Sequence, residues 1–137
     1  MRDELISSLA GPAMNLALAL VGLFIMMLYA SMMGISVNAL MNYQFDMVTL
    51  FWWMFTTVNI SLAVFNLLPI PPLDGYRLIG VFSRKIFLWM RQYSNYIMIA
   101  LLILIFLPGV NVIGNYIMTV SDVIYRFFFM IISLIFY

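Results

Sequence analysis

The sequence predicts an all-α membrane protein, a polytopic bundle of three or four transmembrane helices in a single domain over residues 1–137. Three observations support this fold class. Hydrophobic residues make up 66% of the chain and charged residues only 8%, and a soluble domain of 137 residues has too little interior to hide so much apolar surface. The apolar residues fall into four blocks. The first two blocks are about 20 residues long, which is the length that crosses a bilayer.

The four blocks run over residues 13–33, 47–68, 96–107 and 123–137. The first is entered through Gly11-Pro12, and it predicts a spanning helix, as does the second. The third is shorter and stops at Pro108, and we expect a third span there. The fourth contains Arg126, so the sequence leaves open whether it crosses the membrane or lies at its surface. Residues 108–122 are expected to form a loop.

A proline-rich stretch ends the second block: Asn66-Leu-Leu-Pro-Ile-Pro-Pro-Leu-Asp-Gly75. Prolines lack an N–H group and restrict the residue before them, so we expect no regular helix from Pro69 to Pro72. Irregular backbone at membrane depth is tolerated only where protein or a water-filled cavity covers it. An acid such as Asp74 beside that break is costly, and it is a candidate functional residue for that reason.

The distribution of charge predicts an orientation. The basic residues between the second and third blocks are Arg77, Arg84, Lys85 and Arg91. Residues 34–46 and 108–122 contain no lysine or arginine. Because basic loops stay on the cytoplasmic side, the N-terminus and residues 75–92 are predicted to be cytoplasmic, in a multi-pass protein of the cell membrane. The net charge of +1 gives no reason to expect a nucleic-acid partner.

Small and polar side chains recur at helical spacing in both long blocks. The series are Gly11, Asn15, Ala19 and Gly22 in the first block, and Thr56, Asn59, Ala63 and Asn66 in the second. Such stripes let two helices approach closely and exchange hydrogen bonds. For Asn15 and Asn66, which lie close to prolines, ordinary packing and a role in a site both stay open.

Two interpretations of Asp74 are equally open on spacing alone. Its side chain could cap a helix that begins at Gly75, and Arg77 could neutralise its charge. Alternatively, a carboxylate oxygen could bind a ligand. The two roles are compatible, because a carboxylate has two oxygens.

The stretch from Asn66 to Arg77 resembles the Asn-x-x-Pro-x-Pro-x-Leu-Asp-Gly signature of the site-2 protease-type intramembrane zinc metalloproteases. The run Ala10-Gly-Pro-Ala-Met-Asn15 resembles the Ala-Gly-Pro-x-x-Asn element that opens the preceding core helix of that family. The spacing of the two elements is also similar, and the rest of the chain is similar to the tail of short bacterial members. The likeness covers essentially the whole chain.

The resemblance implies a zinc cofactor and the hydrolysis of transmembrane substrates within the membrane. In the family, a His-Glu-x-x-His helix supplies two zinc ligands and the general base, and the aspartate of Leu-Asp-Gly supplies the third protein ligand. That aspartate corresponds to Asp74. The asparagine eight residues earlier corresponds to Asn66, which is expected beside the site, in contact with substrate backbone or the reacting carbonyl. Arg77 and the Gly75 amide are candidates to orient the carboxylate. The other positions that match the two motifs are Gly11, Pro12, Asn15, Pro69, Pro71 and Gly75.

The chain departs from the family pattern because it contains no histidine, and it has no cysteine either. In the family the His-Glu-x-x-His element lies upstream of Gly-Pro-x-x-Asn. The sequence is therefore interpreted as the C-terminal part of such a protease, inactive alone, with the bilayer, a transmembrane substrate or the missing N-terminal half as partners. Two other hypotheses stay open. One is a non-catalytic protein of the same fold that binds partner helices, and the other is a small transporter or channel subunit that uses Asp74 and Arg77 as an ion relay.

Overall fold

The computed structural model describes residues 2–107 and 111–136, and within these ranges all regular secondary structure is α-helical. The helices are α1 (Arg2–Met32), α2 (Val37–Met41), α3 (Met47–Asn66), α4 (Tyr76–Phe82), α5 (Arg84–Gln92), α6 (Ser94–Phe106) and α7 (Val112–Phe136).

Three of the helices are long and apolar enough to cross a membrane: Ser8–Met32 of α1, all of α3 and all of α7. The helices α5 and α6 pass the same test only as a pair, and the pair is bent by 76°. The pair is therefore a broken fourth span or a re-entrant segment. The predicted fold class, an all-helical protein with three or four transmembrane helices, is confirmed.

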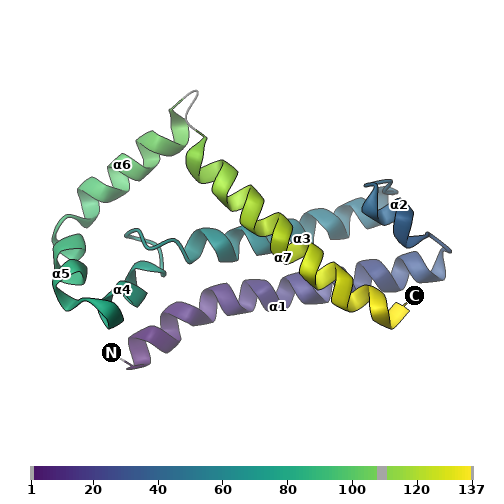
Figure 1. The fold of residues 1–137 in the computed structure, drawn as a ribbon, viewed down its shortest axis with the longest axis horizontal. Coiled ribbons are helices and arrows are strands. Elements are labelled where there is room, and N and C mark those ends of the chain that lie inside the picture. The colour runs from purple at the N-terminus through teal and green to yellow at the C-terminus, as the bar shows by residue number, and fades with distance from the viewer. Residues whose placement is uncertain (1, 108–110, 137) are drawn as a thin grey trace.

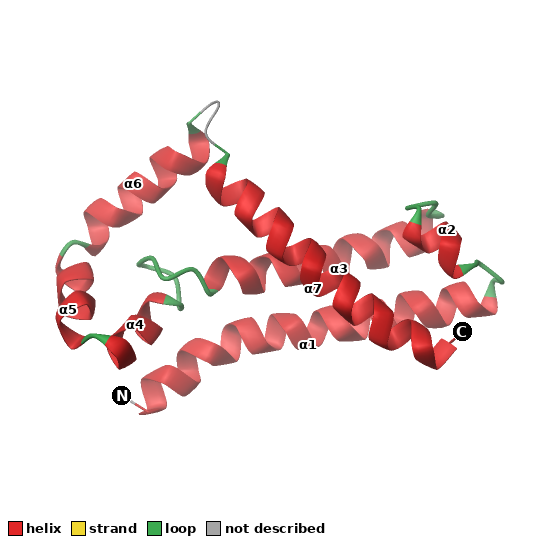
Figure 2. Cartoon of the chain, in the orientation of Figure 1, coloured by secondary structure: helices red, strands yellow, loops and turns green. Residues whose placement is uncertain are grey.

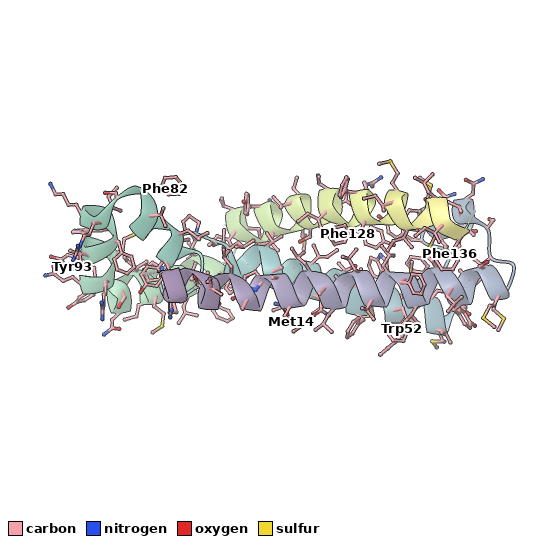
Figure 3. The ribbon with its side chains drawn as sticks, turned by 90° about the horizontal axis from the view of Figure 1, so that it is seen from below. Met14, Trp52, Phe82, Tyr93, Phe128 and Phe136 are labelled. Atoms are coloured by element: carbon pink, nitrogen blue, oxygen red, sulfur yellow. The ribbon has the colours of Figure 1, made fainter. Side chains whose placement is uncertain are left out.

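The two long helices α1 and α3 lie side by side, and α7 crosses over both of them (Figure 1). At one end of this pair, α4 and α5 lie near the N-terminus, and α2 lies at the other end. The loops and turns gather mainly at these two ends (Figure 2). Figure 3 shows α7 along one side of α1, with Phe128 and Phe136 between the two helices and Trp52 on the opposite side.

The first helix begins earlier than the sequence predicted. It starts at Arg2 and continues through Pro12, which lies inside it and is buried. The expectation that the helix would be entered at Gly11-Pro12 is therefore wrong. The residues before the proline include the good helix formers Glu4, Leu9 and Ala10, and membrane helices tolerate an internal proline because neighbouring groups satisfy the freed backbone.

The last helix also begins earlier, at Val112 rather than at Val123, so most of the expected loop over residues 108–122 is helical. The physical reason is the apolar face formed by Ile117, Val120 and Ile124, which packs against the buried core. This spacing of three and four residues continues the helix through its polar positions. With 25 residues, α7 is long enough to span the membrane.

The buried core draws on α1, α2, α3 and α7 and is displaced toward the end of the bundle that carries α2. Its members are Ala19, Leu23, Met26, Met27, Ala30, Leu40, Ile60, Val64, Tyr125, Phe129 and Ile132. The two predicted stripes meet next to this core. The Thr56 hydroxyl donates to the carbonyl of Ala19 at 3.5 Å, and a Cβ atom on Gly22 would lie 2.6 Å from Phe55 Cδ1. The amide of Asn59 instead donates within its own helix, to the carbonyl of Phe55 at 2.8 Å.

Candidate metal centre

The proline-rich stretch forms a compact turn that folds back onto the end of α3. The helix ends at Asn66 and α4 begins at Tyr76. The Gly75 N–H donates to the Asn66 carbonyl at 2.7 Å, which is one of the last carbonyls of α3 and has no partner within the helix. This hydrogen bond brings the residue after Asp74 back to Asn66. Asn66 and Asp74 are eight residues apart in the sequence, and the turn therefore brings both to the end of α3.

Gly75 is required by the space that the turn leaves. A Cβ atom at this position would lie 2.2 Å from the Leu67 carbonyl oxygen and 2.6 Å from that of Leu68. Both of these are backbone atoms that cannot turn aside, so the hydrogen bond to Asn66 forms only with glycine here. Pro71 is fully buried in the same turn.

The side chain of Asp74 is directed at α1. A Cβ atom built on Gly11 would lie 3.5 Å from Asp74 Oδ2, which is van der Waals contact. The residue is half-buried. Its carboxylate makes no hydrogen bond and no ion pair with any residue that the structure describes. An acid held against a membrane helix without such a partner destabilises the fold, so its presence is better explained by a function than by stability.

Two local roles that the sequence left open for Asp74 are not seen. The helix α4 begins at Tyr76 with Gly75 as its N-cap residue, and no side chain caps it, so the proposed capping by Asp74 is wrong. Arg77 is exposed, and the two residues form no ion pair within the described part of the chain. Arg77 therefore does not neutralise the carboxylate in this structure, and its assignment as the group that orients Asp74 stays a prediction.

The described residues do not bring together a complete metal site. No group of three His, Cys, Asp or Glu side chains among them is close enough to hold an ion. A catalytic zinc needs three protein ligands and one open position. Asp74 fits the part of a single carboxylate ligand, because its oxygens are not engaged by other described residues. Asn66 and Asn15 are both half-buried, and neither makes a side-chain hydrogen bond within the described ranges.

The first half of α1, in which Gly11 lies next to Asp74, exposes several small residues. Ala10, Gly11, Ala13 and Ala17 are exposed there, beside the exposed apolar side chains of Leu9 and Met14. Small residues on a membrane helix permit the backbone of another helix to approach closely. The buried core begins only at Ala19. The end of the bundle that carries Asp74 therefore offers a face on which a further helix could pack.

A polar cluster at the opposite end of the bundle was not predicted from the sequence. Asp46 accepts a hydrogen bond from the Thr49 N–H at 2.8 Å and another from the Tyr29 hydroxyl at 2.7 Å. The signal was present, because an aspartate directly before an apolar block is a standard N-cap residue. The second missed feature, the buried hydroxyl of Tyr125, left no such signal in the sequence.

The fold and this site define a polytopic membrane protein that directs one unpaired carboxylate from a proline-rich turn against its first transmembrane helix. The model of Peptidase family M50 matches residues 29–105, which include the whole turn and Asp74. The chain is also similar to "Putative zinc metalloprotease YwhC" of Bacillus subtilis (strain 168), with 35% identity over 117 residues. The alignment covers 81% of this chain and 48% of that relative. No solved structure matches the chain.

The chain therefore belongs to peptidase family M50, and the resemblance to the site-2 protease-type family is confirmed. It spans about half the length of the curated relative that it matches. Membership makes it a membrane protein of a zinc metalloprotease family. The roles of its individual residues are taken up as proposals.

Proposed function

We propose that this chain supplies one part of an intramembrane zinc endopeptidase, with Asp74 as one of three protein ligands to the metal. The observation that supports the proposal is the direction of the Asp74 carboxylate, which faces α1 at Gly11 and has no partner among the described residues. Family membership supplies the chemistry: bound zinc activates a water molecule for attack on a peptide carbonyl.

The chain's own residues hold and direct this ligand. The Gly75–Asn66 hydrogen bond fixes the turn at the end of α3, so the carboxylate is positioned by backbone geometry rather than by another charge. The side chain of Asn66 lies at the same point of the fold and is our candidate to donate a hydrogen bond to the substrate backbone or to the reacting carbonyl.

The 137 residues contain no histidine, so the remaining zinc ligands and the general base would come from a His-Glu-x-x-His helix that is not among them. We propose that this helix packs on α1 around Ala10 and Gly11, which are exposed. There it would face Asp74 across the side-chain-free position of Gly11. The ion-relay hypothesis is less well supported, because Asp74 and Arg77 form no pair in the described structure.

The orientation is also a proposal. The N-terminus, α4 and the basic helix α5 lie at one end of the α1–α3 pair (Figure 1), and the rule that basic segments stay inside makes this end cytoplasmic. Asp74 would then lie near the cytoplasmic edge of the membrane. The substrate would be a transmembrane protein whose helix unwinds locally near that edge.

The test joins this chain to a membrane segment that carries a His-Glu-x-x-His helix, as a fusion or by co-expression. The purified product should contain about one zinc per chain, and Asp74→Ala should lose most of it. Asp122→Ala is the matched control, because it removes a carboxylate from the surface of α7. If Asp74→Ala keeps full metal content and full cleavage, the ligand assignment is wrong.

A second variant separates binding from turnover. Asn66→Ala should keep the zinc and the fold but lose cleavage of a transmembrane substrate, because it removes only a hydrogen-bond donor to the reacting group. The loss expected for one such donor is about 100-fold in kcat. Equal loss of zinc and of activity would instead assign Asn66 a structural role.

A further inference from the structure

A groove between α2 and α7 lies at the end of the bundle away from Asp74. Its volume is about 290 Å³, which is close to the smallest size typical of ligand sites. Its apolar walls come from Val37 and Leu40 on one side and from Phe129 and Met130 on the other. A second cavity of about 120 Å³ shares Tyr125 with the groove.

Tyr125 carries the strongest indication that the groove binds something. The residue is only 8% exposed, and its hydroxyl is fully buried without a hydrogen-bond partner in the described structure. Buried polar atoms in proteins are nearly always hydrogen-bonded, because the desolvation of an unpaired one is costly. Since Tyr125 lines both cavities, an occupant of either could supply the missing acceptor.

The rim of the groove contains the cation Arg126 and, at Tyr43, the turn that ends α2. Arg126 lines the groove, and its Nε donates to Asp122 Oδ2 at 2.7 Å, which leaves its terminal nitrogens without a partner among the described residues. An arginine fork with available N–H groups matches the geometry of a phosphate. Tyr43, which also lines both cavities, has a φ of 55° because it ends α2 in a Schellman motif, in which the Gln44 N–H donates to the Ala39 carbonyl at 2.9 Å.

We propose that this groove binds one membrane phospholipid, with the phosphate on Arg126 and an acyl chain against the apolar walls. When the lipid displaces the side chains that cover the Tyr125 hydroxyl, this hydroxyl donates to an ester or phosphate oxygen of the same lipid. The occupant is a lipid because α7 is a candidate transmembrane helix, so the groove opens to the bilayer. The segment that connects α1 to α3 forms one of its walls, which places the groove near a membrane surface, where phosphates lie. Lipid binding in this groove does not depend on the role proposed for Asp74.

The experiment measures lipid binding to the whole chain, purified in mild detergent, by native mass spectrometry with added dioleoyl phosphatidylglycerol. The wild type should retain one lipid per chain. Arg126→Gln should weaken binding about tenfold, as expected for the loss of a charge-assisted contact. Lys85→Gln is the matched control, because it removes one positive charge at the other end of the bundle, and it should bind like the wild type.

Two further arms address the hydroxyl and the groove itself. Tyr125→Phe removes only the hydroxyl and should weaken binding several-fold. Met130→Trp should fill the groove and displace the lipid without changing any charge, so it keeps the proposal testable if Arg126→Gln fails to fold. Dioleoyl phosphatidylcholine, which shares the phosphodiester, should still bind, whereas oleate, which lacks it, should bind at least tenfold more weakly.

The proposal is overturned if Arg126→Gln and Lys85→Gln retain the same amount of lipid, or if oleate binds as well as the phospholipids. It is also overturned if Met130→Trp leaves lipid retention unchanged. A photo-crosslinker at position 130 that reacts with a second copy of the chain rather than with lipid would identify a protein interface instead.

Discussion

Gly11 of α1 and Asp74 of the proline-rich turn face each other, because a Cβ atom added to residue 11 would lie 3.5 Å from Asp74 Oδ2. The two residues are 63 positions apart in the sequence, and each belongs to one of the two motifs that suggested the family. This arrangement gives a physical reason for the pair of motifs. The glycine keeps the space beside the carboxylate clear, and the turn directs the carboxylate into that space.

A larger residue at position 11 should close this space. In the joined protein, we expect Gly11→Val to reduce zinc affinity about 10- to 100-fold, the range found when the surroundings of a metal ligand are disturbed. Gly114→Val is the control, since it adds the same side chain to α7 at a position where nothing lies within 4 Å of the new Cβ atom. The measurement is a competitive zinc titration. Equal affinities for the two variants would show that the space beside Asp74 is not used by the metal.

Asp74 should contribute nothing to the stability of the chain alone. Because its carboxylate has no partner in the described structure, Asp74→Asn should leave the Tm in detergent unchanged or raise it slightly, as is common when a functional residue is removed. Thermal unfolding followed by circular dichroism measures this. A clear fall in Tm would mean that Asp74 stabilises the fold and would weaken its assignment as a metal ligand.

The parts of the fold that could be predicted were those that follow from local patterns in the sequence. The long apolar blocks predicted α1 and α3, and the spacing of Gly22, Ala19 and Thr56 predicted the face on which these helices meet. The helix boundaries were less predictable. Pro12 lies inside α1 and α7 begins at Val112, because tertiary contacts and the membrane outweigh the local preference of a proline or a polar residue.

The candidate site was predictable only in part, for a related reason. Motif resemblance pointed to Asp74, and the structure then showed what the carboxylate faces. That Gly75 is fixed by the carbonyls of Leu67 and Leu68 could not be read from the sequence, since these contacts depend on how the turn closes. The buried hydroxyl of Tyr125 could not be read either. Its burial results from the packing of α7 on α1 and α3, elements distant from it in the chain.

The turn should not tolerate a side chain at position 75. Gly75→Ala places a Cβ atom 2.2 Å from the Leu67 carbonyl oxygen, so the backbone must move, at a cost of about 1–3 kcal/mol or more. Gly114→Ala is the matched control: nothing lies within 4 Å of its added Cβ atom, and alanine favours the helix by about 0.5–1 kcal/mol. Denaturant unfolding in micelles should show that Gly75→Ala is less stable than the wild type and that Gly114→Ala is not. Equal stabilities would show that the turn is looser than described.

The polar cluster at the start of α3 should make stability depend on pH. Hydrogen bonds from the Thr49 side chain, the Thr49 backbone and the Tyr29 hydroxyl hold the pKa of Asp46 below its ordinary value of 3.8. A carboxyl group whose pKa is lower in the folded than in the unfolded protein stabilises the fold. This stabilisation is fully present at pH values above the pKa of the unfolded protein, near 3.9. It is lost as the pH falls through the pKa of the folded protein. We therefore expect Asp46→Ala to lower the Tm at pH 7 by removing the cap, and the gap to wild type to narrow at pH 3. Asp46→Asn keeps an oxygen that can cap the helix but has no group that titrates, so the Tm of this variant should change less between pH 7 and pH 3 than that of the wild type. A gap that stays constant over this range would show that the Asp46 charge does not stabilise the helix.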